Sequence, residues 1–168
     1  FLSRAWGAGI SPRGIFILGN YAYFASLSGY LTKVDITNPN GIPMLPLENY
    51  YPNLGSYKSA ATYDVFVRVN FAYLADGRFF DIVDISKPSL YNASSVSKTS
   101  LGNAVALEVS GEYAYTANSR NGLRVVDISD PASPSEIGHF AHPGYPLAFT
   151  LDDHFAYVLG RFGLEILN

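Results

Sequence analysis

The feature that most constrains the fold of this chain is an internal repeat. An aromatic residue followed by alanine and tyrosine occurs four times, starting at Tyr21, Phe71, Tyr113 and Phe155, so successive copies lie 50, 42 and 42 residues apart. A period of this length is typical of proteins that stack one supersecondary unit several times, because a single unit cannot bury its own apolar face. We therefore expect four copies of one unit of about 42 residues within a single domain.

A second motif follows the first three copies and indicates where strands end. It reads Val-Asp-Ile, then Ser or Thr, any residue, and Pro, and it begins at Val34, Val83 and Val126. Short runs of β-forming residues alternate with Gly, Asn and Pro turns, which predicts four antiparallel strands in each unit. A helical pattern fits badly, since Pro or Gly interrupts nearly every ten residues. The fold class predicted is all-β, and four hairpin-linked strands of this size are typical of one blade of a β-propeller.

The expected blades span about residues 12–57, 61–99, 103–140 and 145–168. The last blade stops after its third strand, whereas residues 1–6 align with the outermost strand of the third blade. Pairing of residues 1–6 with the last blade would close a four-bladed ring and remove two open sheet edges. Alternatively both ends are open, and the four blades are a segment of a larger propeller, in which case we expect self-association.

These motifs resemble the repeats of the LVIVD-repeat family. The third unit fits best, with Tyr113-Ala114-Tyr115, residues 122–129 and Pro131; Ala72-Tyr73 with residues 81–86 fits well, and the copies nearer each end are weaker. The resemblance implies a β-propeller, commonly in proteins secreted or exposed at the cell surface. It brings no shared catalytic residues with it, so it bears on the fold more than on the activity.

Composition and charge exclude several classes of protein. The net charge is −3 and no run of Lys or Arg exceeds two residues, so we do not expect a nucleic-acid partner. No apolar stretch approaches the length needed to span a bilayer, which predicts no membrane span. Cysteine is absent, which excludes disulfides and thiolate metal sites.

The acidic and histidine residues that recur or cluster are interpreted as structural. Asp35, Asp84 and Asp127 occupy one position in successive units and are expected to cap the turn that follows, rather than to gather at one calcium site. His139, His142 and His154 are expected in loops or turns, not around a metal. We therefore expect neither a metal nor a cofactor.

Two features remain as candidate ligand contacts. Arg13 and Asp64 stand near the start of innermost strands, and hence near one mouth of the channel; an ion pair that braces neighbouring blades is the alternative. The first repeat is eight residues longer than the others, and its extra loop, 41–52, contains Tyr50 and Tyr51. Because loops grow where function is added, these tyrosines are expected either to cover the core or to contact a partner.

Together these observations predict a non-enzymatic scaffold or binding module, extracellular or at the cell surface, that contacts a protein or glycan partner through loops or the channel mouth. Two alternatives stay open. One is a propeller hydrolase or lyase whose residues are gathered from several blades at the mouth. The other is a structural segment of a larger propeller or assembly.

Overall fold

The computed structural model describes residues 11–38, 61–87, 90, 93–141 and 144–168. Within these ranges the chain forms strands and turns, with no α-helix and hence no helix that could cross a membrane. The strands are β1 (Pro12–Leu18), β2 (Tyr21–Ser26), β3 (Leu31–Asp35), β4 (Asp64–Arg68), β5 (Phe71–Asp84), β6 (Ser94–Ser110), β7 (Tyr113–Asn118), β8 (Gly122–Asp127), β9 (Ser135–Phe140), β10 (Pro146–Leu151), β11 (Ala156–Gly160) and β12 (Gly163–Leu167). The prediction of an all-β chain is confirmed.

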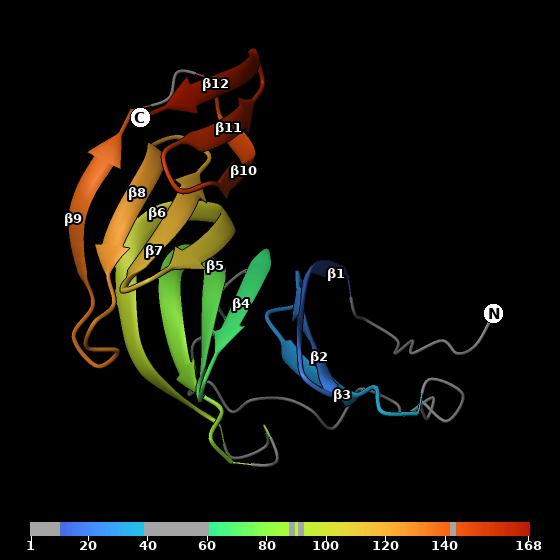
Figure 1. Ribbon diagram of the computed structural model, residues 1–168. Helices are drawn as coiled ribbons and strands as arrows, with labels where there is room; N and C mark the ends of the chain where they lie inside the picture. Colours follow the sequence, from blue (N-terminus) through green and yellow to red (C-terminus); the bar gives the residue numbers. More distant parts are fainter. Residues whose placement is uncertain (1–10, 39–60, 88–89, 91–92, 142–143) are drawn as a thin grey trace.

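The strands form three antiparallel sheets that follow one another in chain order (Figure 1). The first is β1-β2-β3, the second runs from β4 to β9 in sequence order, and the third is β10-β11-β12. Every neighbouring pair is antiparallel and joined directly in sequence. Short hairpins explain this simple order, because an antiparallel neighbour needs only a tight turn to be reached.

The long central sheet contains two repeat units, because β5 and β6 each bend. At Gly77 the backbone φ is 54°, and beyond it β5 runs back along its own first half, so that the Ile85 amide donates to the Asn70 carbonyl. Strand β6 bends at Gly102, where φ is 84°. Residues 94–100 of β6 pair with β5, whereas residues 104–110 pair with β7. Glycine adopts these positive φ values without steric cost.

We accordingly describe four units. The first is β1–β3; the second is β4, β5 and residues 94–101; the third is residues 104–110 with β7, β8 and β9; the fourth is β10–β12. Among the described residues, the second and third units each have the four strands that the repeat predicts. Residues 1–6, which are predicted to complete the fourth blade, lie outside the described residues, as do Tyr50 and Tyr51.

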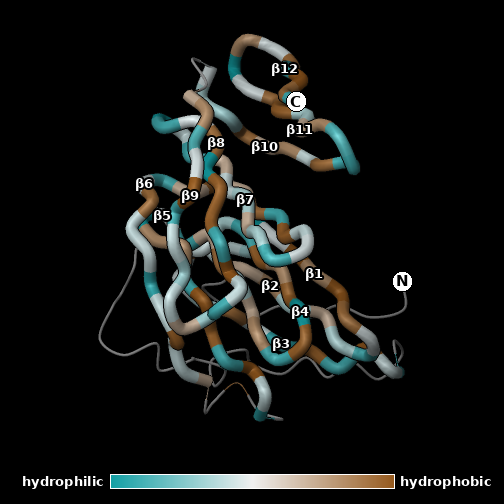
Figure 2. The backbone as a smooth tube through the Cα atoms, turned by 60° about the vertical axis from the view of Figure 1, so that its left-hand side comes forward, coloured by the Kyte–Doolittle hydropathy of each residue, from teal (hydrophilic) through white to brown (hydrophobic). Residues whose placement is uncertain are grey.

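The hydrophobic core lies between successive units rather than inside one of them. The first interface joins Tyr23, Ala25 and Leu31 to the second unit. The second interface joins Tyr73, Ala75, Phe80 and Ile82 to residues of the third unit. Figure 2 shows hydrophobic stretches of β1, β2 and β4 close to one another. The second and third units therefore each pack on a neighbour through both faces, which explains why their strands read as nearly continuous apolar runs.

Aromatic side chains also make contacts between units rather than within one, and they do so from equivalent positions. Phe16 and Phe66 are each paired with the tyrosine of their unit's motif, and their ring centroids lie 4.5 Å apart across the first interface. The third interface is smaller: a buried cluster of Ala117, Leu123 and Val158 joins the third unit to the fourth. Among the described residues, the fourth unit thus packs on its neighbour through the smallest of the three buried clusters.

Candidate functional site

Two carboxylates on first strands connect one unit to the next. Asp64, at the start of β4, accepts the Val65 amide through Oδ1 and the Leu107 amide through Oδ2, both at 2.9 Å. Glu108 in β6 accepts the Leu151 amide of the fourth unit through Oε2 at 3.1 Å. Both links join residues 43 positions apart in the sequence. The same device is therefore used at the second and third interfaces.

Gly14 brings the first unit close to Asp64. A Cβ built at Gly14 would lie 2.5 Å from Asp64 Oδ1 and 2.7 Å from Asp64 Cα. Only a residue without a side chain fits at that separation. The contact places β1 beside β4, so Arg13 and Asp64 come from neighbouring strands; their place near a channel mouth stays a prediction.

The alternative of an ion pair between Arg13 and Asp64 is not what the structure has. No ion pair joins Arg13 to Asp64, both of which the structure describes; Lys98 pairs with Asp81 and Arg124 with Glu136. Arg13 is exposed, and the Asp64 carboxylate is occupied by two backbone amides. Asp64 is therefore positioned as a brace between units, and its use as a ligand contact stays a prediction.

Burial raises the pKa of Asp64 above the ordinary aspartate value, even though its two amide hydrogen bonds act in the opposite direction. The pKa of Glu108 is also raised, first by burial and to a lesser extent by the negative charge of Asp64. A carboxyl group whose folded pKa is raised binds its proton more tightly in the native protein than in the unfolded chain. Its contribution to stability is therefore largest below the unfolded pKa and falls as the pH rises through the folded pKa.

We predict that the Asp64→Asn variant has a flatter stability profile than the wild type at pH values above the ordinary aspartate pKa of about 3.9, where an aspartate with a raised pKa titrates. The measurement is urea unfolding followed by circular dichroism at several pH values. The quantity to compare is the change in unfolding free energy with pH, since the loss of one amide acceptor lowers stability at every pH. Parallel profiles for the two proteins would contradict the raised pKa of Asp64.

The repeated aspartates cap turns and do not converge. The Asp35 carboxylate accepts the Thr37 amide at 2.8 Å, and Asp84 and Asp127 accept the Ser86 and Ser129 amides at 2.8 and 2.9 Å. Each of these bonds spans two residues within one turn, which confirms the capping prediction. The hydrogen bonds lower the pKa of all three carboxyls, with the Thr37 hydroxyl contributing most at Asp35 and the serine amides at the other two.

We predict that Asp127→Ala lowers the melting temperature by a few degrees at neutral pH, because the Ser129 amide loses its partner. The lowered pKa gives this contribution the sign opposite to that of Asp64: it is present above the unfolded pKa and is lost as the pH falls through the folded value. The difference from the wild type should shrink on acidification. Thermal melts at neutral and acidic pH measure it, and a difference that stays constant with pH would contradict the capping role.

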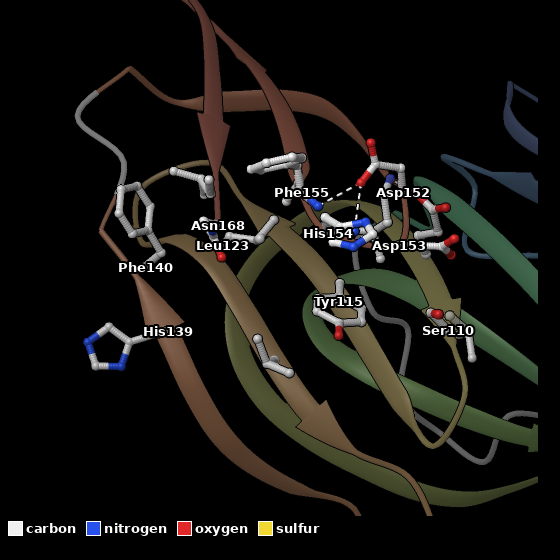
Figure 3. A pocket seen from close by; sticks show the side chains of 16 residues that line it. Ser110, Tyr115, Leu123, His139, Phe140, Asp152, Asp153, His154, Phe155 and Asn168 are labelled. Atoms are coloured by element: carbon white, nitrogen blue, oxygen red, sulfur yellow. Dashed lines mark hydrogen bonds between the residues drawn. The ribbon is translucent and has the colours of Figure 1, made fainter.

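A cleft of about 610 Å³ opens between the third and fourth units. Tyr115 and Leu123 line its third-unit side, and residues 151–156 with Leu167 and Asn168 line its fourth-unit side. In Figure 3 Tyr115 lies below the turn that carries Asp152, Asp153 and His154. The Asp152 carboxylate accepts the His154 and Phe155 amides at 2.8 and 2.7 Å and the Tyr157 hydroxyl at 2.9 Å. These bonds lower the pKa of Asp152 and fix the turn.

The histidines lie apart on this surface. His139 is on β9, 3.8 Å from Glu136, whereas His154 lies in the turn before β11. Figure 3 shows His139 directed away from the turn that carries His154. Within the described ranges no three His, Cys, Asp or Glu side chains are grouped so that they could hold a metal ion. His142 lies outside the described residues.

Sequence reasoning did not single out Glu108 or the cleft. The available signal was weak: Glu108 is the one acidic residue in the apolar run 104–109. An acid within a β-strand is usually solvated, and only the neighbouring unit reveals that Glu108 meets the Leu151 amide. The cleft depends on how closely two units approach, which no local pattern records.

The repeated units of this chain match a known protein family. The LVIVD repeat profile matches residues 11–44, 60–97 and 101–142, which together are more than half of the chain. The chain belongs to the LVIVD-repeat family. The three matched segments coincide with the first three units, and the resemblance noted in the sequence is thereby confirmed. No curated protein matches this LVIVD-repeat chain.

Two solved structures share the fold of the LVIVD-repeat chain at low sequence identity. The computationally designed Ika4 protein has a TM-score of 0.70 at 12% identity, covering 99% of this chain and 96% of its own. The computationally designed Ika8 protein has a TM-score of 0.65 at 11% identity. It covers 93% of this chain, which spans 45% of the Ika8 chain. The likeness supports a propeller-like all-β fold and carries no function with it.

Proposed function

We propose that this chain is a non-enzymatic propeller scaffold, secreted or at the cell surface, that binds a protein or glycan partner. The observation that supports this most is how its acidic side chains are used. Asp35, Asp84 and Asp127 each cap a turn, and Asp64 and Glu108 each accept a backbone amide of the next unit. Carboxylates engaged in this way stabilise a framework, whereas a hydrolase needs acids directed at a substrate.

We further propose that the four units are four blades that close into one ring, forming a single domain. Closure is supported by two exposed apolar faces, one on the first unit and one on the fourth. Ile15 and Ile17 of the first unit are each 59% exposed, although the residues at the same positions in the third unit, Leu107 and Val109, are buried. Burial of such faces against each other is favourable at about 25 cal/mol per Å².

The fourth unit has the complementary face. Leu164 and Ile166 of β12 are 61% and 59% exposed, whereas Phe80 and Ile82, on the face of the second unit that meets the third, are fully buried. The free face of the fourth unit therefore corresponds to the face through which another unit packs on the unit that follows it. The free face of the first unit corresponds to the face through which another unit packs on the unit that precedes it.

The same faces favour a second candidate, a segment of a larger propeller, in which they would meet another copy. That this chain spans about half of Ika8 is compatible with it. A chemical cross-link distinguishes the two. The chain has no cysteine, so a variant with Ile17→Cys and Leu164→Cys contains only the two thiols introduced, one on each free face.

We predict that a short bis-maleimide joins the two thiols within one molecule, giving a monomer of about 18.3 kDa with altered mobility on a denaturing gel. Ile17→Cys and Leu164→Cys singly are the controls, and neither should give this product. Gel filtration of the unmodified protein should also give a monomer. A covalent dimer from the double variant, together with a dimer or larger species in gel filtration, would contradict the closed ring and support the segment of a larger propeller.

Partner binding is tested on the loop 41–52. A printed glycan array is the probe for a glycan partner, and the expected result is a selective signal that Tyr50→Ser with Tyr51→Ser removes, because a tyrosine offers both an apolar ring and a hydroxyl to such a partner. Tyr113→Ser, at a 40% exposed tyrosine on β7, is the matched control. Cleavage of any array glycan would contradict the non-enzymatic proposal.

A further inference from the structure

The charged side chains of this chain are divided between the two ends of its units. In every unit the first strand runs from one end to the other and the second strand runs back, because the two are antiparallel. One end holds the turns that Asp35, Asp84 and Asp127 cap, and we call it the cap end. The opposite end is where first strands begin and second strands stop. In Figure 1 it is the end of the third unit at which β8 begins and β9 stops.

Neighbouring units lie in the same direction, so their equivalent ends are on one side of the molecule. Gly14 and Asp64 each precede the aromatic-Ala-Tyr motif of their unit by seven residues, and they are in close contact. The hydrogen bonds from Leu107 to Asp64 and from Leu151 to Glu108 also join first strands at repeat positions that differ by a single residue. Like ends of the units therefore lie beside one another.

Every unit has an arginine at the end opposite the caps. Arg13 is the second residue of β1, Arg78 follows the bend of β5, and Arg120 and Arg161 lie in the turns after β7 and β11. Arg78 and Arg120 each follow the start of their aromatic-Ala-Tyr motif by seven residues, and Arg161 follows it by six. All four are exposed. We call the surface that they define the arginine end.

Two of the turns that carry these arginines are fixed to the start of the first strand of their unit. The Ser119 amide donates to the Asn103 carbonyl at 2.9 Å, and the Arg161 amide donates to the Gly144 carbonyl. In both cases the donor follows a second strand and the acceptor stands just ahead of a first strand. The arginines of the third and fourth units are thus presented by equivalent backbone geometry.

Within the described part of the chain, no carboxylate forms an ion pair with any of the four arginines of the arginine end. The other arginines that the structure describes have partners elsewhere. Arg124 pairs with Glu136, and Arg68 donates to the Gly111 carbonyl. The arginines that lack an ion pair or a hydrogen-bond acceptor are therefore those gathered at one end.

The carboxylates nearest to the arginine end are already engaged. Asp64 is half-buried and accepts two backbone amides, and Asp76 is 1% exposed and accepts the Thr62 hydroxyl at 3.3 Å. The exposed carboxylates of the described residues lie at or toward the cap end, and they are Asp35, Glu112, Asp130, Glu136, Asp152 and Asp153. The net charge of −3 thus combines an acidic end with a positively charged one, and such a separation attracts anions to one face.

The other exposed residues at the arginine end are mostly polar. In the first three units, the exposed residues of the first-strand starts and of the turns after second strands are, besides the arginines and Pro12, Ser11, Ser28, Asn103 and Asn121. The fourth unit adds an aromatic ring, Phe162, next to Arg161. Hydroxyl, amide and guanidinium groups with an occasional ring suit a sugar chain, whereas a protein interface needs an apolar core.

We propose that the arginine end binds an anionic polysaccharide, with the four guanidinium groups on its carboxylate or sulfate groups. The planar fork of an arginine donates two parallel hydrogen bonds to such an oxyanion, and it does so with more geometric specificity than an ammonium group. One arginine in each unit places positive charge at repeated positions, which matches a ligand whose anionic groups repeat along a chain. The inference rests on the proposed role as a binding scaffold and names the class of its partner.

The probes are a heparin octasaccharide, which carries sulfates and carboxylates, and an oligogalacturonate of the same length, which carries carboxylates only. Each is titrated into the full protein by isothermal calorimetry. We expect saturable binding that weakens about ten-fold or more between about 50 and about 200 mM salt, because each guanidinium contact releases counterions. Binding of both probes assigns the site to carboxylates, binding of heparin alone assigns it to sulfates, and binding of neither overturns the proposal.

Charge variants at the two ends locate the binding. Arg120→Gln should weaken it about three-fold, and Arg78→Gln together with Arg120→Gln about ten-fold, as expected for exposed charge contacts. Lys87→Gln removes the same charge from an exposed residue at the cap end and is the matched control, which should bind like the wild type. All these side chains are exposed, so the melting temperatures should not change. An equal loss of binding in Lys87→Gln would contradict the arginine end.

The arginine Nε–Hε resonances give a second readout that needs no variant. In a ¹⁵N NMR titration with heparin, those of Arg78 and Arg120 should shift. Those of Arg68 and Arg124 should stay in place, because their guanidinium groups already have partners. Shifts at Arg68 and Arg124 that match those at the arginine end would overturn the proposal.

Polyglutamate and a single-stranded oligonucleotide of matched charge test whether charge alone is recognised. Both should bind at least about five-fold more weakly than the better acidic oligosaccharide, because neither presents the ring hydroxyls that serine and asparagine side chains can bind. Neutral maltooctaose should not bind. Equal affinity for polyglutamate or the oligonucleotide would replace the polysaccharide by an acidic protein or a nucleic acid and so overturn the proposal.

These outcomes are separate from the tests of the proposed function. A neutral glycan bound through the loop 41–52 on the array, with no binding of either acidic oligosaccharide, would overturn this inference and leave the binding scaffold intact. Cleavage of a bound oligosaccharide would contradict the non-enzymatic proposal, while its loss of affinity in Arg78→Gln with Arg120→Gln would still assign binding to the arginine end.

Discussion

Replacing Phe80 with alanine is expected to lower the free energy of unfolding by about 3–5 kcal/mol, the range measured for large buried aromatic residues. Phe80 is fully buried in the second interface, and its ring stacks on that of Tyr73 at a centroid distance of 6.2 Å. The truncation removes apolar contact from two units at once. Urea unfolding followed by circular dichroism measures the loss.

Phe162→Ala is the matched control, because Phe162 is 78% exposed in the hairpin between β11 and β12. An exposed substitution of this kind is expected to change stability by less than about 0.5 kcal/mol. If the two variants were equally stable, the second interface would not be a core. The comparison therefore tests whether burial between units holds the fold together.

The second large effect is expected at Gly14. Gly14→Ala should destabilise the protein by about 2 kcal/mol, as overpacking in a close contact typically does. The added Cβ would meet Asp64 Oδ1 at 2.5 Å and Asp64 Cα at 2.7 Å, and the second of these atoms belongs to the backbone and cannot rotate away. Relief requires that β1 move away from β4, which separates the first unit from the second. Thermal and urea unfolding both measure the resulting loss of stability.

Gly138→Ala gives the control for Gly14. Gly138 lies in β9, and the nearest atom to its Cβ would be Val125 Cβ at 4.0 Å. This substitution is expected to be neutral or to stabilise the protein by about 0.5 kcal/mol, because alanine loses less backbone entropy than glycine. A Gly14→Ala variant as stable as Gly138→Ala would mean that the first two units do not approach as described.

The features that recur in every repeat could be predicted from the sequence, whereas the contacts that differ from one repeat to the next could not. The aromatic-Ala-Tyr and Val-Asp-Ile motifs were sufficient for an all-β chain, its strands and the capping role of Asp35, Asp84 and Asp127, because these depend on local turns and on alternation. The approach of Gly14 to Asp64 and the link from Glu108 to Leu151 depend on residues in neighbouring units. Such contacts join positions of no shared local pattern, so they emerged only in three dimensions.

The cleft shows the same limit. Tyr115 looks like Tyr23 and Tyr73 in the sequence, and its different exposure follows from the position of the fourth unit. The place of Arg13 and Asp64 near a channel mouth stays a prediction, whereas the alternative of an ion pair between them was wrong, since Asp64 accepts two backbone amides. A buried carboxylate accepts hydrogen bonds from whichever donors surround it, and the sequence does not show which backbone amides these are.

The amide of Leu107 tests the central claim, that successive units pack face to face, most directly. Its partner Asp64 lies 43 residues away in the preceding unit, and the pKa of Asp64 is raised by burial between the units. In a pH titration followed by ¹⁵N NMR, the Leu107 resonance should shift with a midpoint above the ordinary aspartate value of about 3.9. The shift should disappear in Asp64→Asn. A Leu107 amide that does not respond to pH, or responds identically in the variant, would contradict the stacked arrangement of units.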